Sequence, residues 1–320
     1  MIERNDLMYL GLDIGNAYVK VSNRLKFAAC VVEGEREQDS PSTCYQLDWN
    51  GVSWLVGDEL LGGVRFVEID KYNKEEYQVM VLTALALSAT ADYVDVKLVT
   101  GVPVDYLNSH AAKYQQALKS LKKQTVRIKG YNLDKKVTIN ISDAYVVEQA
   151  ALNLGDPEAY DYPSLFLDFG GGTFDASYWV LDEKGMPHRT KKLSDYNLGF
   201  DKVLQQYADS LKETYDYSED WTFCREYIHQ DSIFLDGEDK DTKMIRDRIL
   251  SRYAKRIFTV INSKNMNYRT VRKIFILGGC AGVMQPYLQD VFKKANLEVD
   301  TDPQFSNARL FEEVAHAVFS

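Results

Sequence analysis

The most informative segment of the sequence is Leu167-Asp168-Phe169-Gly170-Gly171-Gly172-Thr173-Phe174-Asp175. An aspartate ends a short apolar run, and three consecutive glycines separate it from a second one. Glycines lower the stability of a strand, so a fold keeps three of them where only hydrogen atoms fit. Successive N–H groups in such a turn can cradle a phosphate. The segment predicts a phosphate-binding turn, with Asp168 at the carboxyl end of a buried strand and the Thr173 hydroxyl directed at a terminal phosphate. The alternative is a flexible glycine turn without a ligand.

A related segment, Leu12-Asp13-Ile14-Gly15-Asn16-Ala17-Tyr18-Val19-Lys20, lies near the start of the chain. Gly15 lets the backbone turn directly after a buried strand and bring N–H groups against an anion. Asp13 is suited to hold Mg²⁺, directly or through water, because magnesium prefers carboxylate and phosphate oxygens. Lys20 returns on the second strand to meet a phosphate. Taken alone, the segment favours an ordinary hairpin whose lysine is solvated.

Two further positions extend the predicted site. In Ile276-Leu277-Gly278-Gly279-Cys280-Ala281-Gly282, a buried strand opens into small residues that allow the close approach of a flat ligand. The alternative there is a simple strand–helix turn. Glu148 lies among apolar residues of a helix predicted over 143–154. It either orients a water for attack on phosphorus, or it is a solvated helix glutamate.

Alternating strands and helices predict an α/β protein of 320 residues with two domains of related design. The boundary is expected near Gly155–Pro163, where the pattern restarts. The predicted helices cover 75–90, 105–123, 143–154, 201–215, 243–262 and 310–319, and the first is apolar on nearly every side.

Composition excludes several classes of protein. A net charge of −9 and a pI near 5.1 argue against direct binding of nucleic acid, which requires a basic surface. The longest apolar stretch, 79–89, is too short to span a membrane, and acids interrupt the N-terminal segment where a signal peptide is apolar. Four scattered cysteines without metal-ligand spacing suit a reducing compartment. We therefore expect a cytoplasmic protein without a membrane contact.

Three segments, taken together and in this order, resemble the two phosphate loops and the adenosine loop of the actin-like ATPase superfamily. They are DIGNAYVK, LDFGGGTFD and ILGGCAG. This superfamily includes actin, the seventy-kilodalton heat-shock chaperones, sugar kinases and bacterial filament proteins. SDAYVVEQAAL and ARLFEEVAHAVF resemble its two connecting helices, so the resemblance spans the whole chain. Within the superfamily, the chain is similar to ParM-type plasmid-segregation proteins. The similarity lies in its length, its first loop and the segment Thr100-Gly101-Val102-Pro103-Val104-Asp105-Tyr106.

The resemblance implies an actin-like (ribonuclease H-like) two-domain fold with the nucleotide in the interdomain cleft. Domain I would comprise 1–156 and 304–320, and domain II 157–303. It implies an ATPase, with GTP as an alternative substrate, that polymerises into filaments and segregates plasmid DNA through an adaptor protein of ParR type. Glu148 would activate the attacking water, and Asp13 and Asp168 would hold Mg²⁺ and its waters. The phosphates would be held by Gly15, Asn16, Lys20, Gly170, Gly171, Gly172 and Thr173, and the adenosine by Gly278 and Gly279.

Two other functions remain open on the same fold. One is a small-molecule kinase, in which Asp168 or Glu148 would act as the base on an acceptor hydroxyl. The other is a chaperone-like or scaffold ATPase that changes partners with its nucleotide and does not polymerise. Both are compatible with the same loops, because function depends on the site and not on the fold.

Overall fold

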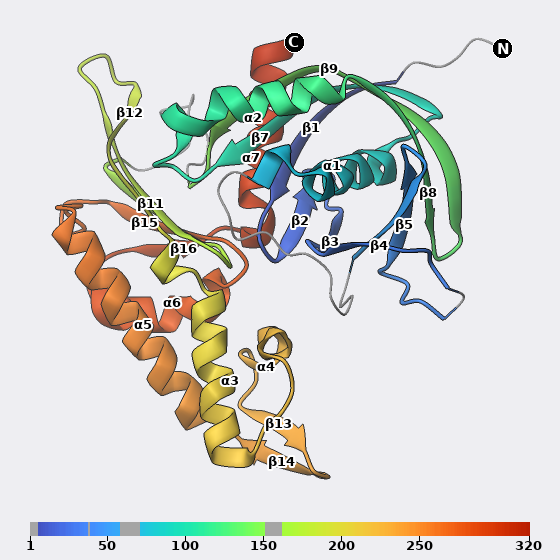
Figure 1. The fold of residues 1–320 in the computed structure, drawn as a ribbon. Helices are drawn as coiled ribbons and strands as arrows, with labels where there is room; N and C mark the ends of the chain where they lie inside the picture. The colour runs from blue at the N-terminus through green and yellow to red at the C-terminus, as the bar shows by residue number, and fades with distance from the viewer. Residues whose placement is uncertain (1–5, 38, 58–70, 151–161) are drawn as a thin grey trace. The chain divides into compact units, whose positions relative to one another are not determined.

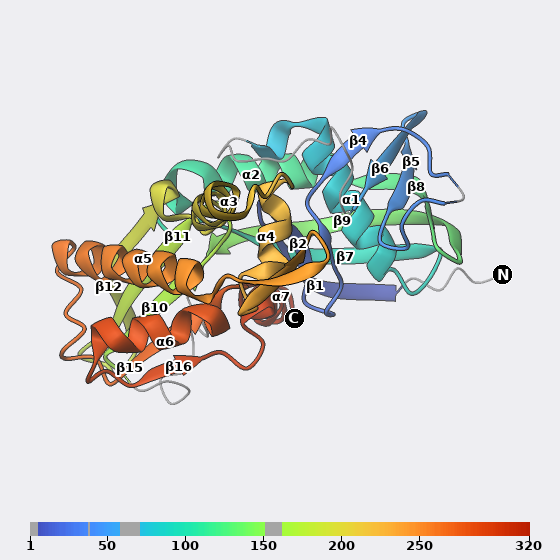
Figure 2. The same ribbon diagram turned by 90° about the horizontal axis from the view of Figure 1, so that it is seen from below.

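The computed structural model describes residues 6–37, 39–57, 71–150 and 162–320. Contacts divide the chain into two compact units, Met1–Leu152 with Phe305–Ser320, and Asn153–Gln304. Both are mixed α/β (Figures 1 and 2). Domains I and II, which the sequence analysis divides between residues 156 and 157, stay a prediction, because that boundary lies outside the described residues. Within the described ranges, no helix is long and apolar enough to cross a membrane.

The first unit is built on a nine-stranded sheet of order β3-β2-β1-β7-β9-β8-β5-β6-β4. Strands β1, β7 and β9 are parallel neighbours at its centre, and their carboxyl ends meet at one edge of the sheet. Antiparallel strands flank them on both sides. The elements of this unit are β1 (Asp6–Ile14), β2 (Tyr18–Val21), β3 (Lys26–Ala28), β4 (Val31–Glu33), β5 (Tyr45–Trp49), β6 (Val52–Val56), η1 (Lys71–Asn73), α1 (Glu75–Ser88), β7 (Tyr93–Val102), α2 (Leu107–Leu121), β8 (Lys123–Gly130), β9 (Leu133–Glu148), η4 (Pro303–Phe305, which ends in this unit) and α7 (Ser306–Phe319).

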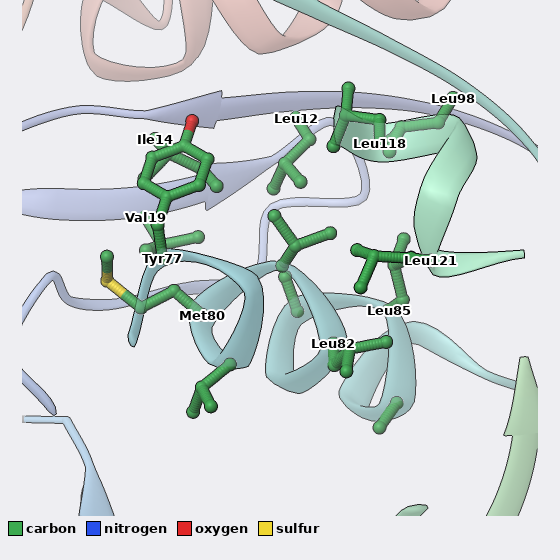
Figure 3. Close-up of a cluster of buried hydrophobic side chains, with 14 of the residues drawn as sticks. Leu12, Ile14, Val19, Tyr77, Met80, Leu82, Leu85, Leu98, Leu118 and Leu121 are labelled. Atoms are coloured by element: carbon green, nitrogen blue, oxygen red, sulfur yellow. The ribbon is translucent and has the colours of Figure 1, made fainter. Parts of the chain in front are cut away.

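Helix α1 is surrounded by the sheet, which explains why its sequence is apolar on nearly every side. Strands β3 and β4 stand at opposite ends of the sheet order, yet only Ala29 and Cys30 separate them in the chain. The sheet therefore curves far enough to bring strands from both of its halves against α1 (Figure 1). Figure 3 shows the resulting core, in which side chains of β1, β2 and β7 meet those of α1 and α2. Labelled there are Leu12, Ile14, Val19, Tyr77, Met80, Leu82, Leu85, Leu98, Leu118 and Leu121.

Helix α7 packs against β1 and β7 through glycines of both strands. A Cβ on Gly11 would lie 1.9 Å from the carbonyl oxygen of Ala308. A Cβ on Gly101 would lie 2.2 Å from Cζ of Phe311. Because real Cβ atoms do not approach other atoms so closely, glycine at these positions lets the helix lie directly on the strands.

The second unit has a five-stranded sheet of order β12-β11-β10-β15-β16 and a separate two-stranded sheet, β13-β14. Alternate residues of β10 (Leu165, Leu167 and Phe169) share a core with apolar residues of α3, α5 and α6. The elements are β10 (Ser164–Phe169), β11 (Phe174–Leu181), β12 (Pro187–Asp195), η2 (Tyr196–Leu198), α3 (Asp201–Tyr215), η3 (Trp221–Phe223), α4 (Cys224–Tyr227), β13 (Ser232–Leu235), β14 (Glu238–Asp241), α5 (Lys243–Ser263), β15 (Lys273–Leu277), α6 (Ala281–Phe292) and β16 (Leu297–Val299).

One predicted helix is wrong. The helices predicted over 75–90, 105–123, 201–215, 243–262 and 310–319 are confirmed as α1, α2, α3, α5 and α7. Residues 143–148, in contrast, continue strand β9, which pairs with β7 as far as Val102 opposite Glu148. A bulge at Ser142 shifts the register and places Ile141 and Ala144 on the same face. The spacing of three residues imitates a helical pattern, and residues 151–154 of the predicted helix lie outside the described part of the chain.

We predict that the contact between Gly101 and Phe311 is energetically coupled. Gly101→Ala should lower the free energy of unfolding by about 1–3 kcal/mol through overpacking, and Phe311→Ala by about 3–5 kcal/mol through loss of a buried ring. The double variant should be about as stable as Phe311→Ala alone, because the new methyl group then occupies vacated space. Urea denaturation of the three variants measures this. Additive losses would contradict the packing described for α7.

Candidate functional site

The first predicted loop is a hairpin whose aspartate is buried and ion-paired. Asp13, the penultimate residue of β1, is only 2% exposed and lies opposite Lys20 of β2. Nζ of Lys20 lies 2.6 Å from Oδ2 of Asp13. The N–H of Gly15 donates to the carbonyl of Tyr18 at 3.1 Å and closes the turn. The structure thus brings Asp13, Gly15 and Lys20 together, and Lys20 is ion-paired instead of solvated.

Glu148 and Gln149 lie at the same edge of the sheet as Asp13. Glu148 is the last residue of β9, is 7% exposed, and stands opposite Val102 at the end of β7. Nε2 of Gln149 donates to Oδ1 of Asp13 at 3.3 Å. The carboxylate of Glu148 is therefore positioned by a strand end, where the sequence predicted a helix.

Lys71 also belongs to this group, although no motif in the sequence marks it. Its Nζ donates to the carbonyl of Ile14 at 2.9 Å and to Oδ1 of Asn16 at 3.3 Å. Burial lowers the pKa of Lys71 to about 8, although the negative charge of Asp13 opposes that shift. Lys71 lies 55 residues after Asn16 in a polar stretch without glycine or periodicity, so only the folded chain reveals the contact.

A buried network of hydroxyl groups supports the end of β1. Oγ1 of Thr100 donates to the carbonyl of Leu12 at 2.6 Å and lies 3.3 Å from the hydroxyl of Tyr114. That hydroxyl is in turn hydrogen-bonded to Tyr77 of α1. Burial raises the pKa of Tyr114 to about 12, so the phenol stays protonated at neutral pH. The strand that carries Asp13 is thereby fixed from the core side.

In the second unit, Asp168 lies directly against the third glycine-rich loop. Asp168 is 4% exposed and stands in β10 opposite Leu277 of the parallel strand β15. The next residue, Gly278, has φ +88°, and a Cβ on it would lie 2.7 Å from Oδ1 of Asp168 and 2.5 Å from the carbonyl of Phe169. Both its backbone conformation and the lack of space require glycine. The structure thus brings together Asp168, Gly278 and the adjoining Gly279.

The Gly170–Gly172 turn is held by the first turn of α3. The N–H groups of Phe200 and Asp201 donate to the carbonyls of Gly170 and Gly171 at 3.0 and 2.9 Å. The carboxylate of Asp201 lies 3.0 Å from the position that a Cβ of Gly171 would occupy. An ion pair of 2.9 Å joins that carboxylate to Arg225 of α4. Sequence analysis missed Asp201 and Arg225, because neither belongs to a glycine-rich motif.

The Thr173 hydroxyl has a partner within its own hairpin. Its Oγ1 donates to Oδ2 of Asp175 at 3.0 Å, and Ser194 of β12 also donates to Asp175. Thr173 could donate to a phosphate only after leaving Asp175. Its predicted role in phosphate binding remains a prediction.

Each unit thus gathers its own part of the predicted set. The first unit holds Asp13, Gly15, Asn16, Lys20 and Glu148. The second unit holds Asp168, Gly170, Gly171, Gly172, Thr173, Gly278 and Gly279. Across the described ranges, no group of three or more His, Cys, Asp or Glu side chains could form a metal site.

Two family models match successive parts of the chain. Residues 11–151 match the N-terminal domain of actin-like proteins, and residues 166–290 match the C-terminal domain of the archaeal actin homologue, MreB-like. No curated protein sequence matches.

Solved structures with the same fold span nearly the whole chain. A 15-stranded ParM filament from Clostridium botulinum gives a TM-score of 0.80 at 16% identity, over 98% of this chain and 99% of the other. The archaeal actin homologue Ta0583 gives 0.79 at 17% identity, over 96% and 98%. ParM of Bacillus thuringiensis with AMPPNP gives 0.71 at 16% identity, over 98% and 99%. Two successive parts of the chain thus match models of actin-like domains, and the chain has an actin-like two-domain fold.

Proposed function

We propose that this protein is an ATPase that polymerises into dynamic filaments when it binds Mg–ATP, and that it segregates plasmid DNA through an adaptor protein of ParR type. The observation that carries the proposal is a pair of similar hairpins, one in each unit. Each has a buried aspartate as the penultimate residue of a central strand, and glycine follows two residues later, Gly15 in the first and Gly170–Gly172 in the second. The structural relatives solved with AMPPNP and with ADP support nucleotide binding. GTP remains an alternative substrate.

Both loops would hold the phosphates of the same nucleotide. In the first, Gly15, Asn16 and Lys20 would supply N–H groups and an ammonium; in the second, Gly170, Gly171, Gly172 and Thr173 would supply backbone and hydroxyl donors. Gly278 and Gly279 would lie against the adenosine, where the absence of side chains permits close approach. The bonds from α3 to the carbonyls of Gly170 and Gly171 fix the second loop before any ligand binds.

The donor set fits a magnesium ion. Magnesium keeps several waters and takes one or two carboxylates together with substrate phosphates, so it needs no cage of three protein carboxylates. Asp13 and Asp168 would hold it, directly or through water. When bound, the ion would neutralise charge on the phosphate oxygens. Lys20 and Gln149 would keep the Asp13 carboxylate in place for this role.

Glu148 would orient the water that attacks the terminal phosphate. Its burial at the end of β9, beside the residue that binds Asp13, supports this role. The carboxylate would accept a proton from the water as the phosphorus–oxygen bond forms, and the nucleoside diphosphate would leave with the electron pair of the broken bond. No covalent enzyme intermediate is required.

Self-association is supported by relatives whose structures are filaments: the Clostridium botulinum ParM filament and an Alp12 filament. The net charge of −9 favours contact with plasmid DNA through an adaptor over direct binding. Both points agree with a cytoplasmic protein that polymerises and carries DNA indirectly.

Polymerisation is tested by right-angle light scattering with pelleting at micromolar protein. Assembly at that concentration requires about 8 kcal/mol of association free energy for each added subunit. With magnesium and ATP, scattering should rise and then fall as phosphate is released. With a non-hydrolysable analogue it should rise and persist, and ADP should give little signal. A flat trace beside clear ATP turnover would contradict the filament and favour the kinase or chaperone alternatives.

Glu148→Ala should separate assembly from hydrolysis. We expect ATP binding and filament formation to persist, while turnover falls about 100-fold or more, because the positioned base is lost. Phosphate release and scattering measured in the same sample check both. Glu213→Ala, which removes an exposed glutamate of α3, is the matched control and should leave turnover unchanged. Turnover near the wild-type rate in Glu148→Ala would remove Glu148 from the mechanism.

A further inference from the structure

Lys71 joins the first loop to the start of α1. It is the first residue of η1, which leads into α1, and it reaches back to the turn that follows β1. Its two acceptors, the carbonyl of Ile14 and Oδ1 of Asn16, lie on either side of Gly15. One ammonium therefore spans the turn that is proposed to bind phosphate.

The lysine retains a donor beyond these two bonds. An ammonium group has three N–H donors, and within the described part of the chain Lys71 gives two of them to oxygen acceptors, while its Nζ lies 5.7 Å from the centroid of the Tyr77 ring. The third donor leaves Lys71 able to bind another acceptor while it holds the loop.

The local charge favours an anion. Two ammonium groups, those of Lys20 and Lys71, act on the single carboxylate of Asp13, with which Lys20 already forms an ion pair. Burial disfavours the charged form of Lys71, as its lowered pKa indicates, and a negative ligand would offset that cost. A sugar or an uncharged base would not, whereas a phosphate would.

We infer that Lys71 is a second phosphate-binding lysine of the first loop, which fixes the Ile14–Asn16 turn with two N–H groups and donates the third to a phosphate of the bound nucleotide. This rests on the proposed nucleotide site and extends it. Lys20 would meet a phosphate while it stays paired with Asp13, and Lys71 would add a second cation whose effect depends on the charge of the ligand.

The test measures dissociation constants for ATP, ADP and adenosine by isothermal titration calorimetry with the full chain and magnesium. Lys71→Met keeps the aliphatic length of the side chain and removes its charge. It should weaken ATP about 10- to 100-fold, in line with loss of one charge-assisted hydrogen bond, and leave adenosine within about twofold. Lys71→Arg should restore much of the ATP affinity. Lys74→Met removes an exposed lysine three residues away and should change nothing.

Three results would overturn the inference, and they differ from one another. Equal weakening of ATP, ADP and adenosine would mean that Lys71 only supports the fold. Wild-type affinities in Lys71→Met would mean that it does not contact the nucleotide, while leaving the proposed function intact. A wild-type chain that binds none of the three ligands would remove the proposed function and this inference together. Asn16→Ala, which removes one acceptor and leaves the ammonium in place, should weaken ATP less than Lys71→Met does.

Discussion

The first unit is built around the ion pair between Asp13 and Lys20, because several of its elements hold the strand end that carries Asp13. A buried carboxylate is costly unless cations and donors surround it, and here Lys20 at 2.6 Å and Gln149 at 3.3 Å do so. The carboxylate stands at the end of β1, which is fixed from one side by the Thr100–Tyr114–Tyr77 hydroxyl network. On its other side, Gly11 lets α7 pack directly on the strand. The sheet, the core helix and the terminal helix thus all hold one short strand end.

In the second unit, the end of the strand that carries Asp168 is also held by its neighbours, here through close contacts between backbone segments. Gly278 lies against both Asp168 and the carbonyl of Phe169, and Gly199 would place a Cβ 2.5 Å from the backbone of Gly172. Glycines therefore serve twice: they form the loop, and they let other segments pack against it. The carboxylate of Asp201, which is ion-paired with Arg225 of α4, lies next to Gly171. A shift of the Gly171 backbone toward it would therefore disturb that ion pair.

Local patterns predicted much of this structure and failed for identifiable reasons. The glycine-rich turns, the buried helix α1 and the bounds of α3 follow from short-range sequence. The bulge at Ser142 broke the two-residue alternation of β9 and made a strand resemble a helix. Lys71 and the Asp201–Arg225 pair were missed, because their partners lie 24 to 57 residues away and nothing in their neighbourhood marks them. Glycine and periodicity are local signals, whereas ion pairs across elements depend on topology.

Hydrogen–deuterium exchange with and without magnesium and ATP tests most directly whether both glycine-containing hairpins bind nucleotide. Peptides covering 12–20 and 168–175 should become protected together, with the same dependence on ATP concentration. Peptides covering the β13–β14 hairpin serve as an internal comparison within the second unit. Protection of one hairpin alone, or protection of the two at clearly different ATP concentrations, would contradict the proposed nucleotide binding.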